Sequence, residues 1–169
     1  MYLGKVICVP DPARARARDE AFFDGSAPPP PAFPHLTDGI LHSVPDSVAG
    51  LLSPHGRVRR GDTEGRFDDV VGTGFVLIGR NRQALAGLGD AVRPLNARTA
   101  MIVPMGADAD PADWEDLDGK FLPFMERHGI EAMLVRPDFY LFGAVRAGED
   151  PRALLGDCAA QLQRFGLMT

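Results

Sequence analysis

The two cysteines are the strongest nucleophiles in this 169-residue chain, and they lie far apart, at Cys8 and Cys158. In an α/β domain, thiol–disulfide exchange typically uses two neighbouring thiols, one with a lowered pKa, at the start of the helix that follows a buried strand. The first such strand expected here is the apolar run Phe75 to Ile78. In this chain that position reads Gly79-Arg80-Asn81-Arg82-Gln83 and holds no nucleophile. Neither a redox pair nor a paired-cysteine zinc site can be drawn, so we predict two free thiols, with Cys158 in the core.

The acidic residues and histidines could do acid–base or metal chemistry, but their spacing argues against it. Asp68-Asp69 and Asp116 to Asp118 lie where turns and helix starts favour aspartate, and no EF-hand spacing appears. The histidines are spread along the chain without an H-x-x-x-H pair, at His35, His42, His55 and His128. We therefore expect no catalytic residue and no metal ligand in this chain.

The segment Gly72-Thr73-Gly74 is the nearest approach to a dinucleotide-binding loop. Such a loop follows a strand and opens a helix, whereas this segment precedes the apolar run Phe75 to Ile78 and lacks the third glycine. We interpret it as a turn and expect no cofactor-binding residue.

Two short basic groups are better explained as solvated surface than as ligand sites. Arg57, Arg59 and Arg60 are followed by Asp62 and Glu64. The second group is Arg80-Asn81-Arg82, and its alternative role is to bind an anion at the start of a helix. The single tryptophan, Trp114, is expected to open a helix and to pack on the sheet edge, with ligand stacking as the alternative.

The overall composition limits the partners and the location of the chain. Its net charge is -5 and 45% of its residues are hydrophobic, which is ordinary for a globular domain. A negative chain has no general affinity for nucleic acid or anionic membrane. No run reaches the roughly 20 apolar residues of a membrane span, and the opening Met1 to Lys5 lacks the features of a signal peptide. We expect a cytoplasmic protein.

The first 65 residues indicate a helix followed by an irregular arm. Asp11-Pro12 is a typical helix start, and we predict a helix from about Pro12 to Phe23. The segment from Gly25 to Pro34 holds five prolines, so it should form an extended spacer. The arm then continues to Gly65 with a few short strands.

The remainder predicts alternating strands and helices. Phe75 to Ile78 and Ala100 to Val103 read as buried strands joined by a helix over Gln83 to Val92. A helix capped by Asp113 and ended by Gly129 should follow, in which Pro123 either makes a kink or marks the true start of the helix. A hairpin of Ala132 to Val135 and Phe139 to Val145 comes next. A final helix opens at Asp150-Pro151 and presents an apolar stripe. The order is the β-α-β-α-β-β-α of a thioredoxin-like α/β core.

Several blocks of the sequence, in the same order, resemble FAD-dependent aromatic-ring hydroxylases of the 3-(3-hydroxyphenyl)propionate hydroxylase group. They are Leu3 to Cys8 with Asp11-Pro12 and Arg18-Asp19, Leu52-Ser53-Pro54 with Gly56-Arg57-Val58, Gly65 to Gly72 with Gly74-Phe75, and Leu134 to Gly143. The resemblance implies the thioredoxin-like C-terminal domain of such an enzyme, which carries no catalytic apparatus. The family's flavin-site motifs are missing, so FAD and NAD(P)H, with O2 and a phenolic ring, belong to the intact enzyme.

The resemblance also implies a division of the chain and a partner. Residues 1–24 would be a connector helix from a flavin domain, 25–65 a Pro/Gly-rich arm, and 66–169 the thioredoxin-like domain. Leu3, Val6 and Ile7 would contact the flavin-binding hydroxylase domain or a second copy of the chain. The first hypothesis is therefore a non-catalytic docking domain. The alternative is an autonomous ligand-binding or enzymatic domain with a pocket between the arm and the sheet.

Overall fold

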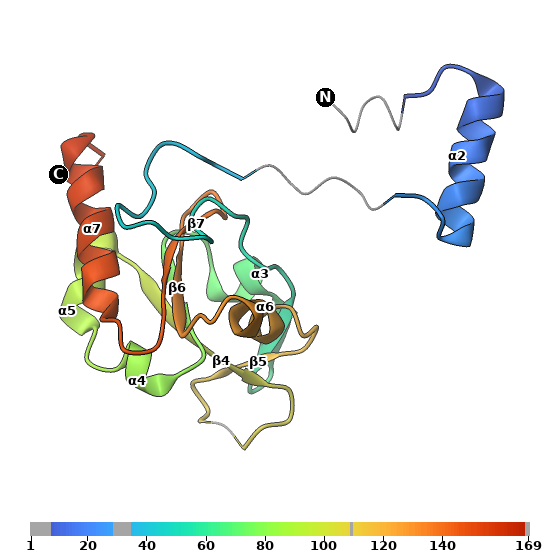
Figure 1. Cartoon of the computed structure of the whole chain (residues 1–169). Helices are drawn as coiled ribbons and strands as arrows, with labels where there is room; N and C mark the ends of the chain where they lie inside the picture. The colour runs from blue at the N-terminus through green and yellow to red at the C-terminus, as the bar shows by residue number, and fades with distance from the viewer. Residues whose placement is uncertain (1–7, 29–34, 109, 168–169) are drawn as a thin grey trace. The chain divides into compact units, whose positions relative to one another are not determined.

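The computed structural model describes residues 8–28, 35–108 and 110–167 (Figure 1). The chain divides into two compact units, Met1–Pro34 and His35–Thr169. This boundary falls inside the segment predicted as an arm, so the division into 1–24, 25–65 and 66–169 stays a prediction. None of the described helices is long and apolar enough to cross a membrane.

The first unit contains helix α2 (Pro12–Asp24), as the Asp11-Pro12 signal predicts. The carboxylate of Asp11 accepts a hydrogen bond from the backbone N–H of Arg14 at 2.8 Å, and Gly25 ends the helix with φ 77°. No residue of α2 is buried.

The second unit is built on one mixed sheet with the strand order β2-β1-β5-β4-β3-β6-β7. Strands β3 and β4 are parallel, as are β4 and β5, and the other neighbours are antiparallel. The strands are β1 (Arg57–Arg60), β2 (Thr63–Arg66), β3 (Val76–Gly79), β4 (Arg98–Pro104), β5 (Trp114–Asp116), β6 (Ala132–Val135) and β7 (Leu141–Val145). The α/β class is therefore confirmed.

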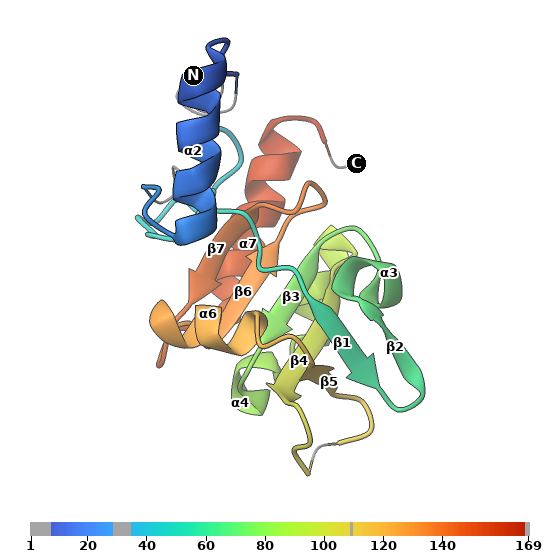
Figure 2. The same ribbon diagram turned by 90° about the vertical axis from the view of Figure 1, so that its right-hand side faces the viewer.

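Helices lie on both faces of this sheet (Figure 2). On one face α6 (Phe121–Arg127) and α3 (Phe67–Val71) pack over Ile78 and Met133. On the other, α7 (Pro151–Arg164) packs over Leu77 and Leu134. The short elements α4 (Arg82–Leu85), α5 (Gly89–Val92) and η1 (Arg93–Leu95) complete the fold. Strands covered on both faces read as continuous apolar runs, which explains why β3 and β6 were predictable.

The predicted hairpin is confirmed as β6 and β7. Ala132 pairs with Val145 and Leu134 with Gly143, and the register shifts before Val135 pairs with Leu141. The turn between the strands is closed by the N–H of Phe139, which donates to the carbonyl of Arg136 at 3.0 Å.

The described segment 35–56 runs beside β7 and forms part of the core. The N–H of His42 donates to the carbonyl of Phe142 at 2.9 Å, and that of Gly50 donates to the carbonyl of Leu141 at 2.8 Å. Val48 is fully buried. Gly50 has φ 80°, and a Cβ there would lie 2.0 Å from the carbonyl oxygen of Leu36, so only glycine fits. Residues 35–56 form no strand apart from the bridge Leu52–Tyr140, and the short strands expected before Gly65 are β1 and β2 at the end of the predicted arm.

Two predicted helices are wrong. The helix over Gln83 to Val92 is broken into α4 and α5, because Ala86 is extended and Gly87 takes φ 64°. The helix predicted to start at Asp113 is instead strand β5, and α6 begins only at Phe121. Apart from these two changes and the additional strand β5, the predicted order β-α-β-α-β-β-α is found from β3 to α7. The specific likeness to thioredoxin stays a prediction.

Candidate functional site

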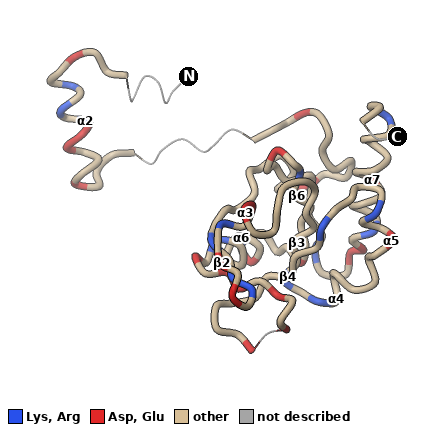
Figure 3. Tube along the Cα trace, turned by 180° about the vertical axis from the view of Figure 1, so that it is seen from behind, with Lys and Arg blue, Asp and Glu red and all other residues tan. Residues whose placement is uncertain are grey.

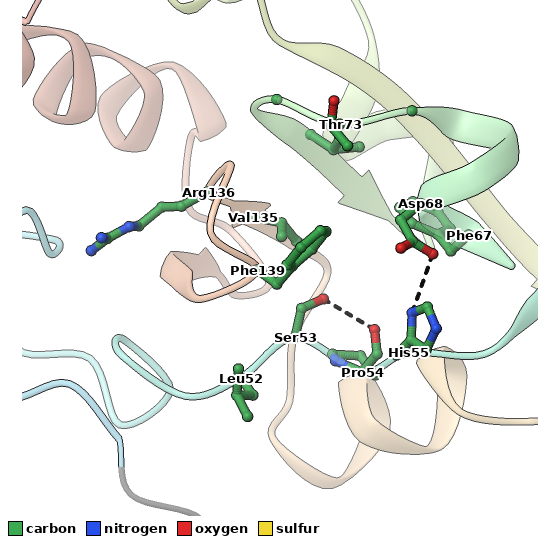
Figure 4. Close-up of a pocket in the computed structure, with 13 residues that line it drawn as sticks. Leu52, Ser53, Pro54, His55, Phe67, Asp68, Thr73, Val135, Arg136 and Phe139 are labelled. Atoms are coloured by element: carbon green, nitrogen blue, oxygen red, sulfur yellow. Dashed lines mark hydrogen bonds and ion pairs between the residues drawn. The ribbon is translucent and has the colours of Figure 1, made fainter.

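A cavity of about 330 Å³ opens in the second unit between the segment 52–55, helix α3 and the hairpin turn (Figure 4). The loop 72–74 and the ends of β3 and β6 complete its wall. Most of the lining is apolar, from Leu52, Pro54, Phe67, Val76, Val135 and Phe139. Three blocks that carry the family resemblance, far apart in sequence, therefore meet here.

The polar groups of this cavity are His55 and Asp68. His55 Nδ1 lies 3.6 Å from Asp68 Oδ1, beyond hydrogen-bonding range. Asp68 Oδ1 is buried, and the carboxylate accepts no hydrogen bond from any described residue. The Ser53 hydroxyl donates to the carbonyl of Pro54 at 3.1 Å rather than to His55. Without a nucleophile on the imidazole, the arrangement can bind a ligand but forms no nucleophile–base–acid triad.

Phe139 forms one side of the cavity in an unusual backbone conformation. Its φ is 66°, a region that bulky residues rarely adopt, and the side chain is 45% exposed. The turn is fixed from both sides, because the carbonyl of Phe139 accepts from the N–H of Ser53 at 2.8 Å and Arg136 donates to the carbonyl of Ile40 at 2.7 Å. No sequence signal indicated this residue, since a left-handed phenylalanine has no local pattern.

The first basic group is engaged with the protein itself. Arg57 pairs with Asp118 and Arg59 with Glu115, each at 2.9 Å, and the guanidinium of Arg60 lies 4.3 Å from the ring centre of Trp114. The hydrogen bond from the Arg57 side chain lowers the pKa of Asp118 below its usual value. Blue and red segments lie close together at β2 in Figure 3. All three arginines of this group therefore have a partner on the protein itself.

The residues around the first βα turn have structural roles. Asn81 accepts from the N–H of Gln83 at 2.9 Å and caps α4. Arg80 pairs with Glu131 at 2.9 Å, and Arg82 pairs with the buried Asp113. Trp114 is buried in β5 between β1 and β4, so the prediction that it opens a helix is wrong.

Of the predicted acidic groups and histidines, only His55 and Asp68 lie close together, in the cavity described above. Asp116 is buried and caps α6, whereas Asp118 pairs with Arg57. His35 is exposed, His42 lies 4.0 Å from Asp157, and the ring of His128 lies 4.7 Å from that of Phe124. Among the residues that the structure describes, no group of three or more potential metal ligands lies together.

The cysteines are both free, with Cys8 exposed and Cys158 on the buried face of α7. Burial, together with the negative charge of Asp157 and against the positive charge of Arg136, raises the pKa of the Cys158 thiol to about 12. The thiol therefore stays protonated at neutral pH, as suits a core residue.

We expect Cys8 alone to react with a thiol reagent in the native protein at pH 8. Only about one in 10⁴ molecules carries a Cys158 thiolate at that pH, and the sulfur is shielded from solvent. Counting labels by mass spectrometry should give one before denaturation and two after it, without prior reduction. The Cys8→Ser variant should give none in the native state, and rapid labelling of that variant would contradict the burial of Cys158.

The predicted interface residues Leu3, Val6 and Ile7 lie outside the described residues.

Comparison with known proteins identifies the family. A family model described as the HcaD C-terminal domain matches residues 50–161. This chain belongs to that family. The matched range covers the whole cavity, from Leu52 to Phe139, and every strand of the sheet.

Curated relatives of this HcaD C-terminal domain are aromatic hydroxylases. The probable NADH-specific resorcinol 4-hydroxylase of Rhodococcus jostii (strain RHA1) is 26% identical over 165 residues, covering 94% of this chain and 30% of that protein. The 3-(3-hydroxy-phenyl)propionate/3-hydroxycinnamic acid hydroxylase of Mycolicibacterium gilvum (strain PYR-GCK) is 30% identical over 131 residues, covering 70% of this chain and 23% of that protein. The resemblance to FAD-dependent aromatic hydroxylases is confirmed. The chain spans less than a third of each relative.

A solved structure supports the fold. The flavin-dependent monooxygenase PieE, in complex with FAD and substrate, aligns with a TM-score of 0.52 at 19% identity, covering 96% of this chain and 32% of that chain. The α/β arrangement of the present chain therefore also occurs within a larger flavin enzyme.

Proposed function

We propose that this HcaD C-terminal domain is a non-catalytic docking domain of a flavin-dependent aromatic hydroxylase. The family match over residues 50–161 carries the proposal, because the matching relatives are hydroxylases three to four times longer than the aligned segment. The intact enzyme would be cytoplasmic and would hydroxylate a phenolic ring with FAD, NAD(P)H and O2. This domain would stabilise its flavin-binding body.

The side chains of the described residues support this role. The charged groups at the first βα turn and at β1 are held in ion pairs, and the cavity contains a carboxylate and an imidazole but no aligned nucleophile. The turn after β3 reads Gly79-Arg80-Asn81-Arg82, with a single glycine. A pyrophosphate needs a glycine-rich turn between strand and helix, where backbone N–H groups can reach it.

We expect the isolated domain to purify colourless and to give no saturable change in FAD fluorescence on titration. The reason is the missing glycine-rich turn, which leaves no cradle for the cofactor phosphates. A yellow protein that keeps a flavin spectrum through gel filtration would show that the domain binds FAD itself.

The docking role itself is tested by co-purification with the flavin-binding hydroxylase body from the same genome. The two should form a complex, and Val6→Asp with Ile7→Asp should weaken it at least tenfold, because burying an apolar side chain contributes on the order of 1.5 to 3 kcal/mol. Leu167→Asp, an exposed apolar position outside the predicted interface, is the matched control.

Light scattering of the domain alone addresses the other predicted partner, a second copy of the chain. Loss of a dimer in the Val6→Asp, Ile7→Asp variant would assign these residues to self-association. A domain that neither binds the flavin body nor stabilises it would refute the docking role.

A further inference from the structure

We propose that the cavity between Phe139 and Phe67 binds a neutral aromatic compound that donates one hydrogen bond, through an O–H or N–H group, to Asp68. This site is separate from the docking role and does not depend on it. The cavity lies within the second unit, between the end of the arm segment and the sheet.

The first observation is the state of the Asp68 carboxylate. Oδ1 is buried 3.6 Å from His55 Nδ1 and accepts no hydrogen bond, whereas the side chain as a whole is 32% exposed, so the carboxylate can still be reached by a ligand. Figure 4 shows the carboxylate facing across the cavity towards Phe139. Because buried polar atoms are nearly always paired, the unpaired Oδ1 shows that the protein itself leaves this carboxylate short of donors, and a ligand O–H or N–H in the cavity would supply one.

The second observation is the conformation of Phe139. A phenylalanine at φ 66° is unfavourable, and here it holds a 45% exposed ring at the cavity. The core gains little from such a ring, since it remains half in solvent. A ligand that covers it would gain apolar contact, so the strained backbone is explained if the ring serves binding.

The third observation is the shape and lining of the space. A volume of about 330 Å³ is at the small end of ligand pockets and suits one or two rings. Phe139 and Phe67 lie on opposite sides of it in Figure 4, with apolar side chains between them. Two aromatic walls favour a flat aromatic ligand, which can stack on one ring and meet the edge of the other.

The charges around the cavity favour a neutral ligand over an ammonium ion. His55, the basic group nearest to Asp68, lies 3.6 Å from its carboxylate, and Arg98 donates to the carbonyl of Thr73 on the cavity wall. Arg136 on the opposite wall is paired with Asp138 at 2.6 Å, and Figure 4 shows it turned away from the cavity. A hydroxyl or ring N–H can satisfy Asp68 without adding a charge.

The test uses 2-naphthol and 2-methoxynaphthalene, which share a ring system but differ in the donor. Titration of the isotope-labelled chain, followed by NMR, should give saturable amide shifts around residues 52–55, 67–74 and 135–139. The dissociation constant for 2-naphthol should be at least about tenfold lower than for 2-methoxynaphthalene, as expected of a hydrogen bond to a charged acceptor.

Three variants separate binding from folding. Asp68→Ala should weaken 2-naphthol about tenfold and leave 2-methoxynaphthalene unchanged. Asp69→Ala, an exposed neighbour in the same turn of α3, should change neither. Phe139→Gly should weaken both probes about tenfold while the protein unfolds at the same or a higher temperature, because glycine takes a positive φ freely.

The proposal is overturned if no saturable shifts appear at the cavity, or if the two probes bind equally well. It is also overturned if Asp68→Ala and Phe139→Gly leave 2-naphthol affinity unchanged, or if the cavity is filled by a second copy of the chain. None of these results bears on co-purification with the flavin body, so failure here is distinguishable from failure of the docking role.

Discussion

Replacing Asp116 by alanine should lower the free energy of unfolding by about 3 kcal/mol, although the residue does not line the proposed ligand cavity. Its carboxylate is buried and accepts three backbone hydrogen bonds at the start of α6, from Lys120 at 3.0 Å, Phe121 at 2.9 Å and Leu122 at 3.0 Å. These are donors that a helix cannot satisfy internally.

The loss is large because water cannot replace the carboxylate. Phe121 is fully buried against Phe67, with their ring centres 4.9 Å apart, so the freed N–H of Phe121 would stay unpaired in the core. Helix α6 has only seven residues and cannot persist on its own propensity. Displacing its first turn would also expose Met125.

Urea denaturation followed by circular dichroism measures the effect. Glu126→Ala, an exposed change within α6, should alter stability by less than about 0.5 kcal/mol. Asp116→Asn keeps one acceptor oxygen and should fall between the two. If Asp116→Ala cost no more than Glu126→Ala, the cap would contribute nothing to the cooperative fold.

The elements that could be predicted from the sequence are those whose signal is local. Strands β3 and β6 are continuous apolar runs covered on both faces, and the Arg136-Pro137-Asp138 turn marks the hairpin. Helix α7 begins with the Asp150 side chain accepting from the N–H of Arg152 at 3.0 Å. In these segments the helix cap, the hydrophobic pattern and the turn residues all indicate the structure that is found.

The errors arise where distant residues decide the structure. Trp114–Asp116 carries acidic residues that favour the first turn of a helix, yet it pairs with β4 and β1. Asp116 does cap a helix, but that helix is α6, which begins at Phe121 after strand β5 and not at Asp113. A strand of three residues is set by its neighbours in the sheet, which no local pattern reveals.

The cavity illustrates a different limit. The sequence placed a pocket between arm and sheet as an alternative, and the blocks that contribute to its lining were noted for their family resemblance. Nothing in them indicated that Phe139 would take a positive φ or that Asp68 would lack a donor. Both properties depend on how segments more than 70 residues apart meet, here shown by the 2.8 Å bond from the Ser53 N–H to the Phe139 carbonyl.

Replacing Asp46 by alanine should destabilise the second unit by about 3 kcal/mol, because it removes a buried carboxylate that accepts two backbone hydrogen bonds and one from a partly exposed arginine. The Asp46 side chain is 2% exposed. It accepts from the N–H of Ala144 at 2.6 Å, from the N–H of Val48 at 3.1 Å and from Arg146 at 3.0 Å. One carboxylate thus fixes the arm segment to β7.

The consequence should extend to the cavity, since the segment fixed by Asp46 continues into residues 52–55 of its wall. In Asp46→Ala, amide hydrogen exchange should accelerate at Gly50 and Leu141, whose N–H groups bond across the arm and β7, and 2-naphthol affinity should fall. Asp38→Ala, an exposed change on the same arm, should affect none of these quantities.

Faster exchange in Asp46→Ala without loss of global stability would mean that the arm opens independently of the core. The fully buried Val48 argues against that, because its side chain cannot leave the core without exposing the residues that pack on it.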